Sequence, residues 1–293
     1  MDNFIVLYNP LAGNGTAQDK MRELESLMQG DRLYFSNMLD IRDYGAFFND
    51  MPDGASIIIC GGDGTLNRFL NDTEDIRPDC DIYYYPSGSG NDFARDIGAE
   101  RGAPPVLINR YIERLPKICV NGKEHRFING IGYGIDGYCC EKGDELSGKG
   151  DGEVNYTAIA IKGLLFHYKP TGATITVDGV EHRFEKVWLA PTMIGRYYGG
   201  GMMPTPEQDR LNGDGAVSVM VYYGSGKLKS LAVFPSIFKG EHIKHSEMVA
   251  VLSGRNITVC FDEPRPLQID GETVPGVREY SVTACEEKVL QPA

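Results

Sequence analysis

The stretch that decides the fold lies at residues 56–65 and has the sequence Ser-Ile-Ile-Ile-Cys-Gly-Gly-Asp-Gly-Thr. Its first half, Ser56–Cys60, is short, rich in β-branched residues and uncharged, which is typical of a strand buried on both faces of a parallel sheet. A glycine-rich turn follows, and the next residues, Thr65–Leu70, have a helical pattern. A buried strand, a glycine turn and a helix in this order predict one unit of a parallel α/β sheet.

The same order of strand, turn and helix occurs on both sides of this stretch. A run of apolar residues is followed each time by glycines and then by apolar residues at helical spacing. The expected elements are the strands Phe4–Asn9, Leu33–Ser36 and Asp81–Tyr85, the turns Pro10–Gly15 and Pro86–Gly90, and the helices Thr16–Gln29 and Asn91–Ile97. The N-terminal part of the chain, residues 1–112, is therefore predicted to be a Rossmann-like parallel α/β domain.

Beyond residue 105 or so the pattern changes to short strands separated by turn signals. Asn121-Gly122 and Asp178-Gly179 each follow an apolar run and predict tight hairpins. Further elements are expected at the strands Ala216–Tyr223, Asn256–Phe261 and Tyr280–Cys285 and at the helices Asn155–Phe166 and Lys227–Phe238. We therefore expect residues 113–293 to form an antiparallel β-sandwich domain, with the active site in the cleft between the two domains.

The composition excludes several classes of protein. The chain has 293 residues, and 29 basic against 41 acidic side chains give a net charge of −12, which argues against nucleic-acid binding. No apolar run reaches the roughly 18 residues of a membrane span. The seven cysteines are scattered and never in a C-x-x-C spacing, which is typical of reduced thiols in the cytoplasm. His242 and His245 lack a third metal ligand nearby and are expected at the surface.

The three glycine turns share a feature that favours phosphate binding. Each follows a strand of the parallel sheet and leads into a helix whose free N–H groups and positive dipole end attract anions. Thr65 and Ser89 add hydroxyl donors at two helix starts. Asp63 and Asp92 would repel phosphates unless a divalent cation lies between them, so the pattern predicts a nucleotide with Mg²⁺.

Simpler interpretations exist for each turn taken alone. An Asp-Gly pair is often only a turn, and the first glycine turn could be an ordinary strand-to-helix connection. None of the three turns matches the Walker A spacing or the G-x-G-x-x-G dinucleotide fingerprint. Their occurrence after three neighbouring strands favours the phosphate-binding interpretation.

Six motifs together resemble a known family. They are Asn-Pro-x-Ala-Gly-x-Gly at 9–15, Gly-Gly-Asp-Gly-Thr at 61–65, Gly-Ser-Gly-Asn-Asp-Phe-Ala-Arg at 88–95, Phe-Ile-Asn-Gly-Ile-Gly-Tyr-Gly at 127–134, Tyr-Gly-Gly-Gly-Met at 198–202 and Asp-Gly-Glu at 270–272. This set resembles the diacylglycerol kinase catalytic-domain family, which includes soluble bacterial lipid kinases and sphingosine and ceramide kinases. NAD kinases and phosphofructokinases are its distant relatives, and the segment 91–95 favours the lipid kinases over them.

The resemblance implies a reaction and assigns residues to it. It implies ATP as phosphoryl donor and a lipid hydroxyl as acceptor, with Asp63 and Asp92 placing Mg²⁺ and the phosphates. An acidic residue of the Asp-Gly-Glu motif would accept the hydroxyl proton; we favour Glu272, with Asp270 as its rival. The residues implied for the nucleotide are Asn9, Pro10, Leu11, Ala12, Gly13, Gly61, Gly62, Asp63, Gly64, Thr65, Leu66, Asn67, Arg68 and Ser89, with Ser36 added.

Three details differ from the family's pattern. The family carries a structural Mg²⁺ in its β domain, and the corresponding stretch here, 206–215, is longer; its best candidate ligands are Asp214 and the carbonyls of Leu211 and Ala216. Ser89 stands where threonine is usual, which keeps the hydroxyl. The sequence ends early, at Ala293, which leaves only the last few residues for a return of the chain to the first domain.

The resulting hypothesis is an ATP- and Mg²⁺-dependent lipid kinase that converts diacylglycerol to phosphatidic acid. The alternatives are a kinase for another alcohol, such as a sphingoid base, phosphatidylglycerol or NAD, and a non-catalytic regulator that binds nucleotide or lipid. We expect a cytoplasmic protein that contacts the membrane transiently, and a homodimer is one possible oligomeric state. The basic, amphipathic segment 225–246 would either lie on an anionic membrane or pack its apolar face on the β domain.

Overall fold

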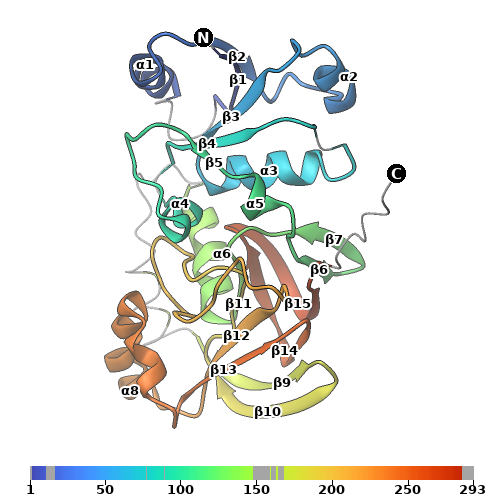
Figure 1. The fold of residues 1–293 in the computed structure, drawn as a ribbon. Coiled ribbons are helices and arrows are strands. Elements are labelled where there is room, and N and C mark those ends of the chain that lie inside the picture. The colour runs from blue at the N-terminus through green and yellow to red at the C-terminus, as the bar shows by residue number, and fades with distance from the viewer. Residues whose placement is uncertain are drawn as a thin grey trace. The chain divides into compact units, whose positions relative to one another are not determined.

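The computed structural model describes residues 2–10, 17–76, 78–88, 90–147, 159, 163 and 168–285. The chain separates into two compact units, Met1–Glu113 and Arg114–Ala293 (Figure 1). Each unit has a cluster of buried hydrophobic residues of its own. Unit 1 contains parallel strands with helices, and unit 2 contains antiparallel strands, so the predicted fold class is confirmed.

Unit 1 is built on one five-stranded sheet with the strand order β2-β1-β3-β4-β5. Its strands are β1 (Asn3–Tyr8), β2 (Arg32–Asn37), β3 (Ser56–Gly61), β4 (Ile82–Pro86) and β5 (Val106–Leu107). The first four run parallel, and β5 is antiparallel to β4 at the edge. This order places β1 and β3 at the centre, where their apolar residues are covered on both faces.

Helices pack on both faces of this sheet. They are α1 (Ala17–Leu27), α2 (Tyr44–Asn49), α3 (Asp63–Asp72), α4 (Asp92–Ile97) and α5 (Asn109–Ile112). Leu24 of α1 packs with Phe4 and Val6, which share one face of β1. Helix α2, which the sequence patterns do not predict, packs on α3, and the ring centroids of Tyr44 and Phe69 are 5.9 Å apart.

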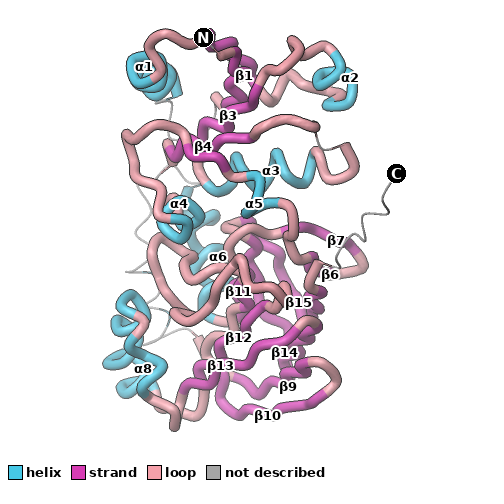
Figure 2. Tube along the Cα trace, in the orientation of Figure 1, coloured by secondary structure: helices cyan, strands magenta, loops and turns pink. Residues whose placement is uncertain are grey.

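Unit 2 contains a ten-stranded sheet (Figure 2). Its strands are β6 (Lys117–Val120), β7 (Lys123–Arg126), β8 (Gly130–Tyr133), β9 (Thr171–Val177), β10 (Val180–Val187), β11 (Thr192–Met193), β12 (Val217–Tyr222), β13 (Val249–Gly254), β14 (Asn256–Ile269) and β15 (Glu272–Thr283). The long strand β14 pairs with β9 through its first half and with β8 through its last residues. Register shifts between Cys260 and Leu267 mark bulges, which bend a strand and let one sheet wrap a core.

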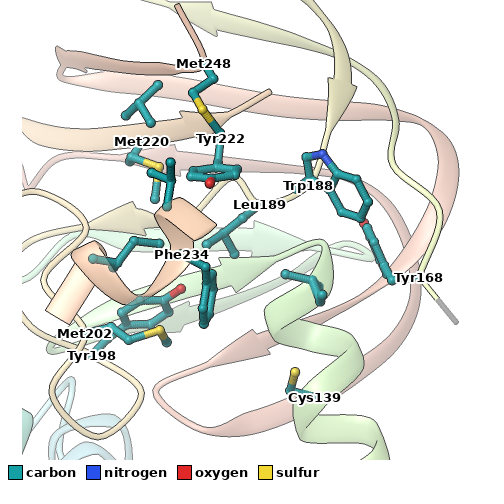
Figure 3. Packing of buried hydrophobic residues seen from close by; sticks show 14 of the residues in the cluster. Cys139, Tyr168, Trp188, Leu189, Tyr198, Met202, Met220, Tyr222, Phe234 and Met248 are labelled. Carbon is teal, nitrogen blue, oxygen red and sulfur yellow. The ribbon is translucent and has the colours of Figure 1, made fainter. Parts of the chain in front are cut away.

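A methionine- and aromatic-rich cluster fills the core of unit 2 (Figure 3). Trp188, Tyr222 and Met220 are almost completely buried in it. Helix α6 (Ile135–Ser147) packs against β14 and β15 and contributes Ile135 and Cys139 to the same cluster. Unit 2 therefore has a continuous apolar core of its own.

The predicted helix Lys227–Phe238 is divided in two. Helix α8 (Lys227–Val233) continues into the 3₁₀ helix η3 (Phe234–Lys239), and a second 3₁₀ helix, η4 (Glu241–Lys244), follows. The change coincides with Pro235, which lacks an N–H to continue an α-helix. Val233, Phe234 and Ile237 are buried in the core, whereas Leu228 is 79% and Phe238 40% exposed. The apolar face of this segment therefore packs mainly on its own unit.

Two expectations concern other helices. Apart from residues 159 and 163, the expected helix Asn155–Phe166 lies outside the described residues. In the described part of the chain, no helix is both long and apolar enough to cross a membrane.

Candidate functional site

The carboxyl ends of three strands in unit 1 lie next to one another. Tyr8 at the end of β1 is opposite Cys60 of β3, and Gly61 is opposite Pro86 at the end of β4. The three glycine turns therefore start from one edge of the sheet, as parallel strands require for a shared ligand site. Ser36 lies one residue before the end of β2, opposite Leu7.

Part of the predicted first turn is not described. Asn9 and Pro10 follow β1 directly and are half-buried. Leu11, Ala12 and Gly13 of that turn, and Ser89 of the third turn, lie outside the described residues.

The second and third glycine turns touch through their backbones. A Cβ placed on Gly88 would lie 2.5 Å from the Cα of Gly62, and a Cβ on Gly62 would lie 3.1 Å from the Cα of Gly88. A backbone cannot turn aside as a flexible side chain could, so position 88 requires glycine and position 62 leaves little room for a side chain. The two predicted phosphate-binding turns therefore lie in close contact.

The carboxylate of Asp63 holds the start of α4. Its Oδ2 accepts a hydrogen bond from the backbone N–H of Asp92 at 2.9 Å, and its Oδ1 accepts one from Phe93 at 3.0 Å. Asn91, before the helix, has φ +51° and donates from Nδ2 to the Gly88 carbonyl at 2.8 Å. A residue predicted to place a cation thus also fixes the third turn.

The carboxylates of Asp63 and Asp92 both lie close to Gly90. A Cβ on Gly90 would lie 3.6 Å from Asp63 Oδ2 and 3.9 Å from Asp92 Oδ2, and Asp92 is only 4% exposed. No group of three or more His, Cys, Asp or Glu side chains suited to a metal occurs among the described residues. The pair fits Mg²⁺, which commonly binds through one or two carboxylates and completes its shell with substrate phosphates and water.

The other predicted nucleotide residues lie along α3, which starts at Asp63 rather than Thr65. Thr65 and Leu66 are buried, so Leu66 could offer a ligand only its backbone. Arg68 is exposed and pairs with Asp72 at 3.3 Å, one helical turn along. Gly64 has open space where a Cβ would stand. The first turn of α3 is therefore the part of this helix that is placed to meet a phosphate.

In unit 2 the Asp-Gly-Glu motif forms a tight hairpin turn. Ile269 of β14 pairs with Glu272 of β15, which leaves Asp270 and Gly271 as a two-residue loop. Their φ angles of +46° and +99° are those of a type I′ turn, which favours Asp-Gly. The motif is therefore a turn rather than a continuous strand.

The turn separates the two candidate proton acceptors. The carboxylate of Asp270 accepts backbone hydrogen bonds from Ile128 at 2.6 Å, Asn129 at 2.9 Å and Gly130 at 3.0 Å. Glu272 is exposed, and its carboxylate has no hydrogen bond or ion pair in the described part of the chain. Asp270 thus joins two of the sequence motifs, and Glu272 is the carboxylate left available for chemistry.

Some residues around this turn have no counterpart in the sequence motifs. Arg210 donates from Nη1 to the Ile128 carbonyl at 3.0 Å and from Nη2 to Asn129 Oδ1 at 3.4 Å. The sequence motifs also do not include Asp136 and Gln268, which form a buried, hydrogen-bonded pair that is linked to the turn through Gly271. Their nearness to the motifs in sequence, two residues after Gly134 and two before Asp270, was the only available signal.

The stretch 206–216 is closed by a side-chain amide. Asn212 donates from Nδ2 to the carbonyls of Asp209 at 2.7 Å and Ala216 at 2.9 Å, and its Oδ1 accepts from the Ala216 N–H at 2.8 Å. Gln208 donates a second hydrogen bond to the Ala216 carbonyl at 2.9 Å. That carbonyl does not fit a cation while these bonds exist.

The remaining candidate ligands of this metal site are exposed. Asp214 and Leu211, of which the carboxylate and the carbonyl are the candidates, are both exposed residues. The structural metal at Asp214, Leu211 and Ala216 stays a prediction, and no chemical step depends on it.

Family models match nearly the whole described chain. The diacylglycerol kinase catalytic domain matches residues 3–117, and the YegS C-terminal NAD kinase beta sandwich-like domain matches residues 129–286.

Individual relatives agree with these models. A diacylglycerol kinase of Mycobacterium tuberculosis (strain H37Rv) is 26% identical over 246 residues, covering 81% of this chain and 77% of the relative. One of Bacillus subtilis (strain 168) is 29% identical over 224 residues, covering 74% and 70%. A solved diacylglycerol kinase structure from Bacillus anthracis (strain Sterne) has a TM-score of 0.59 at 19% identity, covering 97% of this chain and 94% of that one. A further structure from the same strain has a TM-score of 0.66 at 18% identity, with coverages of 97% and 93%.

Proposed function

Because this chain belongs to the diacylglycerol kinase catalytic-domain family and carries its YegS-type C-terminal domain, we propose that it is an ATP- and Mg²⁺-dependent lipid kinase. It transfers the γ-phosphate of ATP to a lipid hydroxyl, and the acceptor we propose is diacylglycerol, which gives phosphatidic acid. Family membership supports the lipid kinase class, and the relatives' names support the acceptor.

In this proposal unit 1 holds the nucleotide. Phosphoryl transfer needs mainly alignment and neutralisation of phosphate charge. The backbones of the touching turns at Gly62 and Gly88, together with the start of α3, offer N–H groups to the phosphates. Bound Mg²⁺ would neutralise charge on the β- and γ-phosphates, and Asp63 and Asp92 would hold it.

Unit 2 supplies the group that accepts the proton. The hydroxyl of an alcohol has a high pKa, so a carboxylate must take its proton as the new P–O bond forms. Asp270 already accepts three backbone N–H groups and so has little capacity for this task. We therefore assign proton acceptance to Glu272, and this contrast between neighbouring carboxylates is the observation that carries the assignment.

The test is a phosphorylation assay with a matched control. Purified protein is incubated with γ-labelled ATP, Mg²⁺ and mixed micelles containing diacylglycerol, with sphingosine, phosphatidylglycerol and NAD as separate acceptors. We expect labelled phosphatidic acid from the wild type and from Glu181→Gln, an exposed carboxylate on β10, and little from Glu272→Gln. Label in another acceptor would correct the substrate. Tight ATP binding without transfer to any acceptor would indicate a regulator instead of an enzyme.

A lipid acceptor also implies contact with a membrane. We propose a cytoplasmic enzyme that binds the bilayer transiently, supported by Leu228 at the start of α8, which is 79% exposed between two lysines. Sedimentation with anionic vesicles should recover the wild type and less of Leu228→Glu; equal recovery of both would exclude α8 from the contact.

A further inference from the structure

The side-chain amide of Gln268 connects a buried carboxylate to the Asp-Gly-Glu turn. Its Nε2 donates to Asp136 Oδ2 at 2.9 Å, and its Oε1 accepts from the backbone N–H of Gly271 at 2.6 Å. Gln268 is 3% and Asp136 9% exposed. Both bonds lie within unit 2, and the second one involves Gly271, the residue directly before Glu272.

Gly132, which has no side chain, leaves the space for the hydrogen bond between Gln268 and Asp136. Gly132 of β8 is directly opposite Gln268 in the sheet. A Cβ on Gly132 would lie 1.5 Å from Asp136 Oδ2 and 2.6 Å from Gln268 Nε2, so even alanine would displace the pair. Within the 127–134 motif, Gly132 therefore leaves the space in which the side chains of Asp136 and Gln268 meet.

The chemistry of the pair fixes the orientation of the amide. An ionised carboxylate can only accept hydrogen bonds, and a backbone N–H can only donate. If the amide of Gln268 turned over, its oxygen would face Asp136 Oδ2 and its NH₂ would face the N–H of Gly271. Both contacts would then be repulsive, so Asp136 keeps the oxygen of Gln268 directed at the turn.

The turn is consequently held from two directions. Asp270 donates its N–H to the Gly130 carbonyl at 3.1 Å, and Gly271 donates its N–H to Gln268. Both central residues of the hairpin loop are thus hydrogen bonded through their backbones to residues outside the loop, Asp270 to Gly130 of β8 and Gly271 to Gln268 of β14. Glu272 is the next residue, and the direction of its Cα–Cβ bond follows from the geometry of this turn.

We propose that Asp136 and Gln268 are positioning residues for Glu272: the carboxylate orients the amide, and the amide fixes the turn that presents the proton acceptor. This inference rests on the proposed function, because it requires that Glu272 acts in the reaction. A displacement of about 1 Å at a reacting group can lower a rate by about 100-fold, so a loose turn is costly to kcat.

The experiment is a double-mutant cycle on kcat, with thermal stability measured in parallel. Gln268→Met keeps the size of the side chain and removes both hydrogen bonds. We expect kcat to fall about 10- to 100-fold with an unchanged KM for ATP, since the nucleotide is assigned to unit 1. In a Glu272→Gln background the same substitution should lower kcat no further, although Tm falls equally in both backgrounds. Equal fold-losses in both backgrounds would overturn the proposal.

Variants of Asp136 test the direction of the effect. Asp136→Leu should lower kcat as Gln268→Met does, and Asp136→Asn, which keeps an oxygen acceptor for Gln268, should recover most of that loss. No recovery in Asp136→Asn would contradict the orienting role.

A matched control is the buried pair of Thr192 and Tyr280, whose hydroxyls lie 2.8 Å apart in the same unit. Thr192→Val should lower Tm and leave kcat close to wild type. A fall of kcat in Thr192→Val as large as that in Gln268→Met would assign the effect to general loss of stability and overturn the proposal. If Glu272→Gln alone keeps wild-type kcat, the proton-acceptor assignment itself fails, and that result is read separately from the cycle.

Discussion

Asp270 and Gly130 exchange two hydrogen bonds across 140 residues of sequence. The N–H of Asp270 donates to the Gly130 carbonyl at 3.1 Å, and the N–H of Gly130 donates to Asp270 Oδ1 at 3.0 Å. The exchange ties the hairpin turn of β14 and β15 to the first residue of β8. It also gives Asp270 a structural task that its neighbour Glu272 does not share.

This difference predicts that substitution of Asp270 lowers stability more than substitution of Glu272 does. Asp270→Asn keeps a residue type that tolerates the positive φ but weakens the three backbone hydrogen bonds, so we expect a loss of about 1–3 kcal/mol of stability. Glu272→Gln should change stability by less than about 0.5 kcal/mol, because its side chain is exposed. Urea denaturation of both variants measures the contrast. Equal losses of stability would show that Glu272 also supports the fold.

Catalysis should show the opposite order. Loss of a general base commonly lowers a rate by about 10²- to 10⁴-fold, and we expect a kcat loss in that range for Glu272→Gln. Asp270→Asn should retain more activity than Glu272→Gln at a temperature where both are folded. If Asp270→Asn is the less active variant, the assignment of the proton acceptor must be exchanged.

The contact between Gly62 and Gly88 predicts that alanine is not tolerated at residue 88. Its Cβ would lie 2.5 Å from a backbone atom that cannot move aside, and overpacking of this kind costs about 1–3 kcal/mol. Gly64→Ala is the matched control for stability: its Cβ meets open space and alanine suits a helix, so Tm should stay equal or rise. Thermal denaturation of both variants tests this; similar Tm values would show that the turns can separate.

The parts of the fold that could be predicted from the sequence are those with a strong local pattern. The run of isoleucines before Gly61 predicted β3 almost to the residue, because burial on both faces demands an unbroken apolar strand. Helix α3 starts two residues earlier than expected, since Gly64 inside its first turn counts against a helix in any local pattern. The strand β8, Gly130–Tyr133, was not expected for the same reason.

The parts that could not be predicted depend on contacts between distant residues. Asp136 and Gln268 are 132 residues apart, and no spacing in the chain connects them. His242 was expected at the surface, and that was wrong: it is fully buried and its Nε2 bonds the Pro204 carbonyl at 2.8 Å. The capping of α4 by Asp63 is of the same kind, because it joins residues 29 positions apart in the sequence.

The side-chain amide of Asn212 closes the stretch 206–216 by hydrogen bonds, and we therefore expect the protein to be equally stable with and without a metal ion at this stretch. Asn212 forms three hydrogen bonds there, so Asn212→Ala should cost about 1–3 kcal/mol by leaving backbone groups unpaired. EDTA should leave the Tm of the wild type unchanged. Because Asp214 is exposed, Asp214→Asn should have the same Tm as the wild type. A Tm that falls with EDTA in the wild type but not in Asp214→Asn would show that the family's structural cation is present here.

The buried carboxyl of Asp136 predicts a specific dependence of stability on pH. Burial is the main cause that raises its pKa to about 6, while the hydrogen bond from Gln268 opposes the rise. Because the unfolded chain has the ordinary value near 3.8, the folded state binds the proton more tightly between about pH 4 and pH 6. The contribution of this group to stability is therefore greatest below pH 4, falls as the pH rises to about 6 and then stays constant. A shift of about two pKa units corresponds to about 3 kcal/mol at most.

Asp136→Asn removes this titration, so the stability of the variant relative to the wild type should rise across that window and level off above it. Parallel urea titrations between pH 4 and pH 8 measure the difference, and a flat difference across the window would show that Asp136 is ionised in the folded protein throughout.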